Sequence, residues 1–124
     1  MEWKLELVNV PVSDVDRAKE FYVDKVGFDL DHDHTVNDQI RFVQLTPPGS
    51  ACSIAIGKGL GSDAQPGSAK GLQLVVPDIQ AARAELVGRG VEVSEVQEFP
   101  WGHFVFFNDP DGNAWAVQYI PDRG

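Results

Sequence analysis

The stretch Asp31–His34 is the densest group of side chains in this sequence that could do chemistry, because each of its four residues is a potential metal ligand. Successive side chains of a strand point to opposite faces, so His32 and His34 would share one face and Asp31 and Asp33 the other. No three of them then converge on one ion without outside help. The spacing favours a solvated edge strand, and a metal site at His32 and His34 stays open as the alternative.

Two histidines are candidates for proton transfer near neutral pH. His34 could act in this way if its face is the concave one, where we expect it to meet Arg41 of the next strand and a bound molecule. His103 and Trp101 follow the segment "EFP", at a lip where a loop could close over a ligand. His34, His103 and Arg41 are therefore the candidate catalytic residues.

The composition excludes several classes of protein. The chain has 124 residues, 43% of them hydrophobic and 23% charged, which suits one soluble globular domain. A formal net charge of -9 would repel the phosphates of nucleic acid. No apolar run approaches the roughly 20 residues that span a bilayer. The single Cys52 allows no internal disulfide, and the first residues carry no secretion signal, so we expect a cytoplasmic protein.

The elements that must position these residues begin with a strand. Apolar and polar residues alternate over Leu5–Val12, and apolar residues then recur at helical spacing from an Asp14 cap to Gly27. Three short runs, "FDLDHDH", "IRFVQL" and "ACSIAI", follow as strands between polar or Pro/Gly turns. The first half is therefore predicted to be β-α-β-β-β.

The same order returns after a segment of small and polar residues. Residues 58–70 have the composition of a linker, and "LQLVV", a helix capped by Asp78, "HFVFF" and "NAWAVQYI" follow it. Asp14 and Asp78 are 64 residues apart, and "PPGSACSI" aligns with "PDGNAWAV" at a spacing of 63. Residues 1–57 and 71–124 are thus predicted to be two modules of one domain.

The fold class that follows is α+β. Each short module covers one face of its sheet with its own helix and leaves the other face without a partner. We expect the two β-α-β-β-β modules to form a curved, trough-like mixed sheet with the helices on the convex side, and the concave face to make a pocket.

Two segments, "VPVSDVDRAKEFYVDKVGF" and "FVFFNDPDGNAWAVQ", resemble the vicinal oxygen chelate superfamily, which includes glyoxalase I, extradiol dioxygenases, fosfomycin-resistance transferases and bleomycin-resistance proteins. The paired layout covers nearly the whole chain. In metal-dependent members, a His precedes the helix cap of each half by seven residues, and each last strand carries a Glu. The resemblance transfers these four ligand positions to Leu7, Gly71, Ser53 and Ala116.

None of those four side chains is a usual metal ligand. Ser53 is placed through the internal repeat, and a slip of one residue would put Cys52 or Ile54 there instead. A lone thiolate still leaves too few ligands for an ion. We therefore expect no metal and no other cofactor.

Counting by two along the strands from these positions, and adding pocket residues that the resemblance implies, predicts an apolar, aromatic hollow with a few amides. Buried amides need hydrogen-bond partners, which a ligand or water could supply. The alternative is that Phe104 and Phe106 simply fill a core. The expected ligand-binding residues are Leu7, Asn9, Ser53, Gly71, Gln73, Trp101, Phe104, Phe106, Ala114, Ala116 and Gln118.

The sequence therefore predicts a glyoxalase-like or bleomycin-resistance-like protein that binds a small, partly aromatic organic molecule without a metal. The runner-up is an enzyme of the same fold, either a lyase or dioxygenase or a cofactor-free acid–base catalyst. A subunit that binds a protein partner is the third possibility. Two modules leave an incomplete trough, so we expect a twofold homodimer in which the second protomer completes each pocket.

Overall fold

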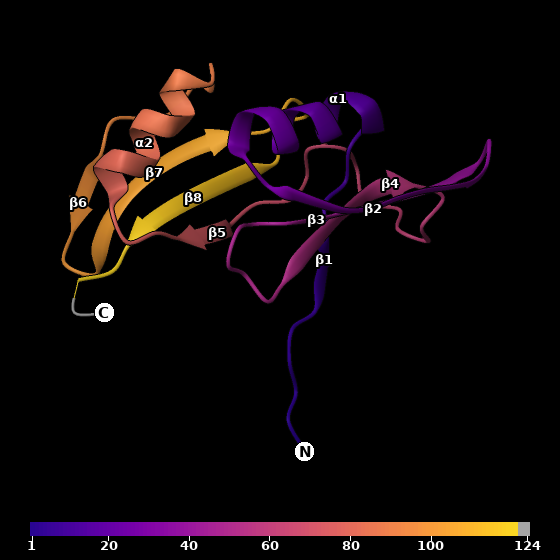
Figure 1. Ribbon diagram of the computed structural model, residues 1–124, viewed down its shortest axis with the longest axis horizontal. Helices are drawn as coiled ribbons and strands as arrows, with labels where there is room; N and C mark the ends of the chain where they lie inside the picture. Colours follow the sequence, from indigo (N-terminus) through magenta and orange to yellow (C-terminus); the bar gives the residue numbers. More distant parts are fainter. Residues whose placement is uncertain (122–124) are drawn as a thin grey trace.

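The computed structural model describes residues 1–121, and it divides the strands between two four-stranded sheets, one for each half of the chain (Figure 1). The first sheet contains β1 (Leu7–Asn9), β2 (Asp29–Asn37), β3 (Ile40–Thr46) and β4 (Ser53–Lys58). The second contains β5 (Leu72–Val75), β6 (Gln97–Phe99), β7 (Gly102–Asn108) and β8 (Ala114–Tyr119).

Both sheets have the same topology. Their strand orders are β1-β4-β3-β2 and β5-β8-β7-β6. In each sheet the first and last strands of the module pair in parallel, and the other neighbours pair antiparallel. Parallel pairing requires a long connection between the two strands, and the helix and two strands of the module lie within it. The prediction of two β-α-β-β-β modules in an α+β fold is confirmed.

Aspartate side chains begin both helices, as predicted. The Asp14 carboxylate accepts a hydrogen bond from the Arg17 amide at 3.1 Å at the start of α1 (Val15–Glu20). Asp78 accepts one from the Ala81 amide at 3.0 Å at the start of α2 (Ile79–Gly88). These bonds satisfy amides that have no partner within the helix.

The first helix changes its winding half-way. After α1 the chain continues as a π-helical segment, η1 (Phe21–Val26), which ends where Gly27 takes φ 93°. Gly27 and Phe28 both donate from their amides to the Tyr22 carbonyl oxygen. The wider turn places Phe21 and Tyr22 side by side on the buried side of the segment.

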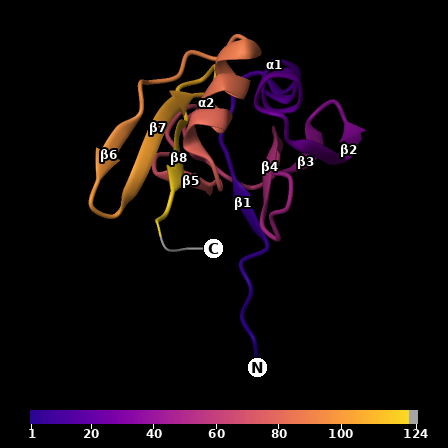
Figure 2. The same cartoon turned by 60° about the vertical axis from the view of Figure 1, so that its left-hand side comes forward.

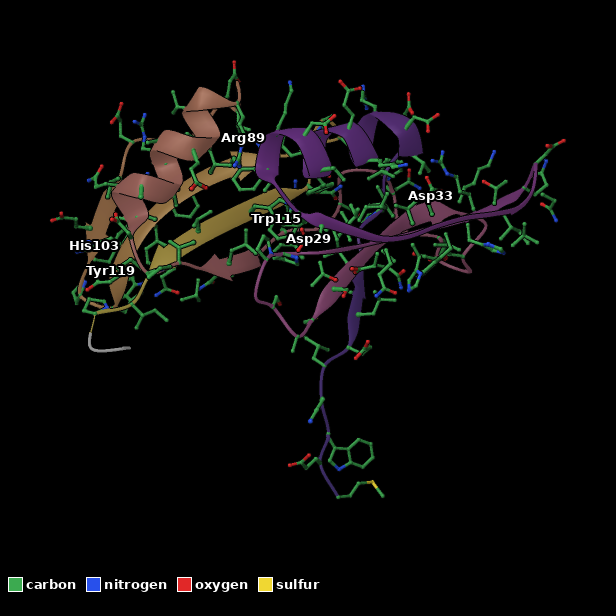
Figure 3. The ribbon with its side chains drawn as sticks, in the orientation of Figure 1. Asp29, Asp33, Arg89, His103, Trp115 and Tyr119 are labelled. Atoms are coloured by element: carbon green, nitrogen blue, oxygen red, sulfur yellow. The ribbon has the colours of Figure 1, made fainter. Side chains whose placement is uncertain are left out.

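Both helices lie on the same side of the sheets, as the two views of the ribbon show (Figures 1 and 2). One core cluster fills the space between the helices and the sheets, and it draws residues from both modules. Trp115 of β8 lies under the first helical segment (Figure 3), with its ring centroid 5.7 Å from that of Tyr22. Within residues 1–121, no helix is long and apolar enough to cross a bilayer.

The first residues differ from the expectation. The strand predicted over Leu5–Val12 is only three residues long, and residues 1–6 extend away from the body of the protein (Figure 1). Trp3 is 87% exposed, so it packs neither at a sheet edge nor against a helix of its own chain. A strand needs a partner, and β4, the neighbour of β1, begins at Ser53 opposite Leu7.

Candidate functional site

The face of the second sheet that is turned away from α2 carries six of the predicted ligand-binding residues. Along β7 and β8, Val105, Phe107, Trp115 and Val117 are buried in the core under the helices, so the alternate residues lie on the opposite face. The strand register confirms that they lie side by side, because Phe106 pairs with Ala116 and Ala116 pairs with Gln73. We call this surface the open face; its predicted members are Gln73, Phe104, Phe106, Ala114, Ala116 and Gln118.

A ladder of aromatic rings runs along the open face. Phe104 and Phe106 are parallel to within 3°, with ring centroids 5.9 Å apart. Trp101 stacks on Phe99 at 5.2 Å, and Phe99 meets Phe104 edge to face at 5.8 Å. Trp101 is 62% exposed and Phe106 39%, so these two rings remain accessible to a ligand, whereas Phe104 is buried between its neighbours in the ladder.

Phe99 is a member of the ladder that the sequence analysis did not identify. It lies in β6, which pairs with β7 so that Phe99 faces Gly102 and Gln97 faces Phe104. Cross-strand partners share a face of the sheet, so the pairing with Gly102 puts Phe99 on the side of Phe104. Counting by two along the chain from Phe104 leads to Glu98 instead, so the register of the hairpin was needed to find Phe99.

Alanines form a floor beside the ladder. In the row across the sheet, Ala116 separates Phe106 on β7 from Gln73 on β5. Strands are about 4.8 Å apart, so the Cα atoms of Phe106 and Gln73 are about 10 Å apart with only a methyl group between them. The small side chain of Ala116 therefore leaves a shallow depression in the open face, with the Phe106 ring on one side and the Gln73 amide on the other.

Gln118 is the buried polar residue of the open face. Its Nε2 donates to the Trp101 carbonyl oxygen at 2.9 Å, and its Oε1 accepts a hydrogen bond from Gln73 Nε2. Gly102, with φ 151°, makes room for this amide, because a Cβ atom there would lie 2.7 Å from Gln118 Nε2. The last strand is thereby tied to the turn that carries Trp101.

Two of the predicted ligand-binding residues lie in the first sheet: Leu7 of β1 and Ser53 of β4, which are paired neighbours. The Ser53 hydroxyl is buried and is engaged by the Thr46 hydroxyl at 2.6 Å and by Gln44 Nε2 at 3.4 Å. Thr46 also donates to a carboxylate oxygen of Asp31. Ser53 therefore belongs to a local polar cluster within its own sheet.

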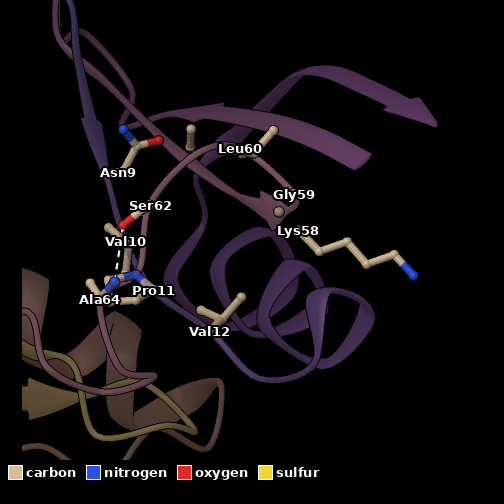
Figure 4. Close-up of a pocket in the computed structure, with 11 residues that line it drawn as sticks. Asn9, Val10, Pro11, Val12, Lys58, Gly59, Leu60, Ser62 and Ala64 are labelled. Atoms are coloured by element: carbon tan, nitrogen blue, oxygen red, sulfur yellow. Dashed lines mark hydrogen bonds between the residues drawn. The ribbon is translucent and has the colours of Figure 1, made fainter. Parts of the chain in front are cut away.

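Asn9 lies at the end of β1 beside a cavity of about 190 Å³ (Figure 4). The loop after β4 forms the other wall of this cavity, where Leu60 and Ser62 lie. Lys58 lines the same cavity, but its ammonium group points away from it in the close-up. Asn9 thus lies in the first sheet, whereas the aromatic ladder and the amides of Gln73 and Gln118 lie in the second.

The placement of Gly71 is wrong by two residues. The repeat aligned Gly71 with Leu7, yet β5 begins at Leu72, and the residue beside Ala116 is Gln73. The segment between strand and helix cap is two residues longer in the first module, since Val10 and Val76 make equivalent bonds to the last strands while their caps are Asp14 and Asp78. A spacing counted back from the cap cannot detect this difference.

The residues at the four ligand positions do not fit a divalent ion. Such an ion needs several nitrogen, oxygen or sulfur donors that converge. Leu7 and Ala116 offer only carbon, Gln73, which takes the place predicted for Gly71, offers one amide oxygen, and the Ser53 hydroxyl is already engaged. Residues 1–121 hold no group of three or more His, Cys, Asp or Glu side chains placed to bind a metal.

The expectation that His34 meets Arg41 is wrong. His34 pairs with Phe42, so Arg41 points to the other face of the hairpin, toward α1. There its guanidinium group bonds Asp33 at 2.8 and 3.0 Å and Asp16 at 2.7 Å. Hydrogen bonds from Arg41 and Lys19 hold the pKa of the Asp33 carboxyl well below its usual range. Arg41 therefore ties the hairpin to α1, where it lines a cavity of about 480 Å³ on the side of the hairpin opposite His34.

His103 also lies on the opposite side from the ladder. It alternates with Phe104 along β7 and pairs with Tyr119, whose ring centroid is 5.5 Å away (Figure 3). The prediction that His103 stands with Trp101 at the lip of the pocket is wrong for this reason. Of the two residues, only Trp101 joins the aromatic ladder.

A buried polar group beneath the helices joins the modules, and the sequence analysis missed it. The Tyr22 hydroxyl donates to Asp109 at 2.7 Å and accepts from Trp115 Nε1 at 2.9 Å. Burial, followed by the nearby Asp109 carboxylate, raises the pKa of the Tyr22 phenol far above its usual value. Asp109 also accepts bonds from Asn113, whose side chain donates to the Pro11 carbonyl oxygen at 2.8 Å.

A family model described as the Glyoxalase/Bleomycin resistance protein/Dioxygenase superfamily matches residues 4–117. The chain belongs to this superfamily. The uncharacterized protein YetH of Bacillus subtilis (strain 168) is 31% identical over 115 residues, which are 90% of this chain and 93% of that protein.

Two solved structures from Streptomyces sp. CB03234 are similar to this member of the superfamily. One is TnmS3, described as an antibiotic binding protein, with 38% identity, a TM-score of 0.86 and coverage of 96% of this chain and 97% of that one. The other is described as a glyoxalase/bleomycin resistance protein, with 39% identity, a TM-score of 0.81 and coverage of 93% and 99%. The resemblance inferred from the sequence is confirmed.

Proposed function

We propose that this superfamily member binds a small, partly aromatic organic molecule on the open face, without a metal. The aromatic ladder beside the alanine floor is the observation that carries the proposal. The exposed rings of Trp101, Phe99 and Phe106, with Phe104 packed parallel to Phe106, offer a flat ligand both apolar area and stacking partners. The six residues that define the open face are all uncharged, which suits an uncharged ring system, and Glu92 lies at the margin, beside Phe106.

The chemistry of the donors supports metal independence. Ring stacking and apolar contact need no ion, and the positions that hold the ion in metal-dependent relatives offer only an engaged hydroxyl group and one amide oxygen, too few donors for an ion. We expect dialysis against a chelator to leave the affinity for the ligand unchanged. The antibiotic-binding description of a relative that is 38% identical supports a ligand of antibiotic size.

A second copy of the chain is the expected cover for the open face. Ligand sites usually enclose most of their ligand, and an exposed sheet face cannot do so alone. Trp3 and Leu5 on the extended first residues are also exposed, and they add apolar surface for such a contact. We propose a twofold homodimer in which the partner closes the site.

The test is a binding screen with aromatic antibiotics and metabolites, followed by calorimetry on the compounds that raise the melting temperature. Phe106→Ala should weaken their binding about tenfold, the loss expected when one stacked ring is removed from a partly exposed site. Val36→Ala is the matched control, because Val36 is a similarly exposed apolar residue in the other sheet. Compounds that bind Phe106→Ala and wild type equally well would place the site elsewhere, for example at the apolar cavity of about 260 Å³ between Phe28, Leu74 and Phe107.

A further inference from the structure

The amides of the open face form a chain whose direction can be worked out from one end. The Trp101 carbonyl oxygen can only accept a hydrogen bond, so the group of Gln118 that faces it at 2.9 Å must be the nitrogen. Gln118 Oε1 then faces Gln73, and the Gln73 nitrogen donates to it. Neither amide can be turned round without setting two acceptors or two donors against each other.

The free end of this chain is a carbonyl oxygen. Gln73 uses its nitrogen toward Gln118, and no residue in the range 1–121 donates to its Oε1 atom. Gln73 is exposed, whereas Gln118 is only 6% exposed. The acceptor therefore stands at the accessible edge of the alanine floor, opposite Phe106.

The residues next to Gln73 in its sheet carry no charge. Its neighbours across and along the sheet are Ala116, Leu72, Leu74 and Val75. Val75 is 51% exposed and lies on the open face beside Gln118. A ligand that rests on the floor thus meets rings on one side and a single fixed acceptor on the other.

We infer that the open face selects flat aromatic molecules that carry a hydroxyl or N–H group at the ring edge, and that Gln73 Oε1 accepts the hydrogen bond from that group. This inference rests on the proposed function and adds the chemical class of the ligand. The backbone carbonyl of Trp101, acting through Gln118, orients the Gln73 amide; Gln118 is a positioning residue and Gln73 the residue that contacts the ligand.

The experiment compares β-naphthol with its O-methyl ether by NMR titration of the full chain. The ether has the larger apolar surface, so apolar contact alone would favour it. An added hydrogen bond between neutral groups is worth roughly a factor of five, so wild type should bind the naphthol at least about fivefold more tightly than the ether. Gln73→Met, which keeps the length of the side chain but has no oxygen, should bind both compounds with the affinity of the ether.

A matched control makes the outcome specific. Gln80→Met makes the same substitution on the exposed side of α2 and should behave like wild type. The ether affinity of Gln73→Met also reports whether that variant is folded.

Each result decides between the two proposals. If wild type binds the two compounds equally, or if Gln73→Met keeps the preference, the selection of donors is wrong while aromatic binding stands. If wild type binds neither these compounds nor any other flat aromatic molecule, the proposed function itself fails.

Discussion

Tyr22 is the residue on which the association of the two modules most depends. It comes from the first module, but its hydroxyl group bonds only to residues of the second, Asp109 and Trp115. Its ring stacks on Phe28 with centroids 5.5 Å apart and is fully buried. A hydroxyl group in such a place satisfies a donor and an acceptor that water cannot reach.

Replacing Tyr22 with Phe should therefore destabilise the protein by about 2 to 4 kcal/mol, because the Trp115 N–H and the Asp109 carboxylate would each lose a partner while buried. Urea unfolding at neutral pH measures the change. Tyr119→Phe is the control, since Tyr119 is only half-buried and its hydroxyl group makes no hydrogen bond within the described chain; its effect should stay within about 0.5 kcal/mol. Equal losses in the two variants would contradict the role given to Tyr22.

At the scale of elements, the β2–β3 hairpin is held against α1 by charge. Asp33 of β2 receives bonds from Lys19 of α1 at 2.7 Å and from Arg41 of β3, and Arg41 also reaches Asp16 of α1. These side chains link three elements, although the residues of the hairpin strand β2 are all exposed.

The hairpin contacts should make stability depend on acid. The pKa of Asp33 is lowered in the folded state, so its ionised form stabilises the fold above the pKa of an unfolded aspartate, about 3.9, and this contribution is lost as the pH falls below that value. At neutral pH, Asp33→Asn should cost about 1 kcal/mol. The difference between variant and wild type should narrow in urea unfolding at pH 3, and a constant difference from pH 7 to pH 3 would exclude this origin.

The turn between β6 and β7 depends on Gly102. A Cβ atom there would lie 2.6 Å from the Tyr119 carbonyl oxygen, as well as against the Gln118 amide, and φ of 151° is unfavourable for other residues. Gly102→Ala should cost about 1 to 3 kcal/mol and shift the NMR signals of the Gln118 side-chain amide. In Gly88→Ala, where nothing lies within 4 Å of the added carbon near the end of α2, stability should stay level or rise. Unchanged Gln118 signals in Gly102→Ala would show that the turn tolerates a side chain.

The elements also explain which features could be predicted from the sequence. Alternation along "NAWAVQYI" correctly separates Ala114, Ala116 and Gln118 from the core, because a strand in a sheet has a period of two regardless of its neighbours. The Asp14 and Asp78 caps could also be predicted, because a helix cap depends only on the residues next to it in the sequence. The placement of Gly71 was wrong because the segment between strand and helix differs in length between the two modules, which the spacing of the repeat does not reveal. The predicted contact between His34 and Arg41 was wrong because the register of the hairpin, which puts them on opposite faces, cannot be deduced from the sequence of either strand alone.

For the whole molecule, the open face and the exposed first residues predict self-association. Sedimentation velocity should give a mass of twice 13.6 kDa at micromolar concentration. Trp3→Ser should weaken the dimer, because it removes a large exposed ring, whereas Val87→Ser on the outer side of α2 should not. A monomer at every concentration, with and without an aromatic ligand, would contradict the dimer.

The turn Asp109–Gly112 has a consequence for how the two halves of the chain relate. Asp111 accepts bonds from the amide and hydroxyl groups of Ser13, at 3.1 and 2.5 Å. At the spacing of 63, the first module has Thr46 and Pro48 where the second has Asp109 and Asp111, so it offers no matching pair of carboxylates. The turn of the second module therefore binds the start of the first helix, and the first module has no equivalent contact of this kind to the second. The halves are therefore no longer interchangeable copies, and a permuted chain with their order reversed would need a connection long enough to bring Ser13 back to Asp111.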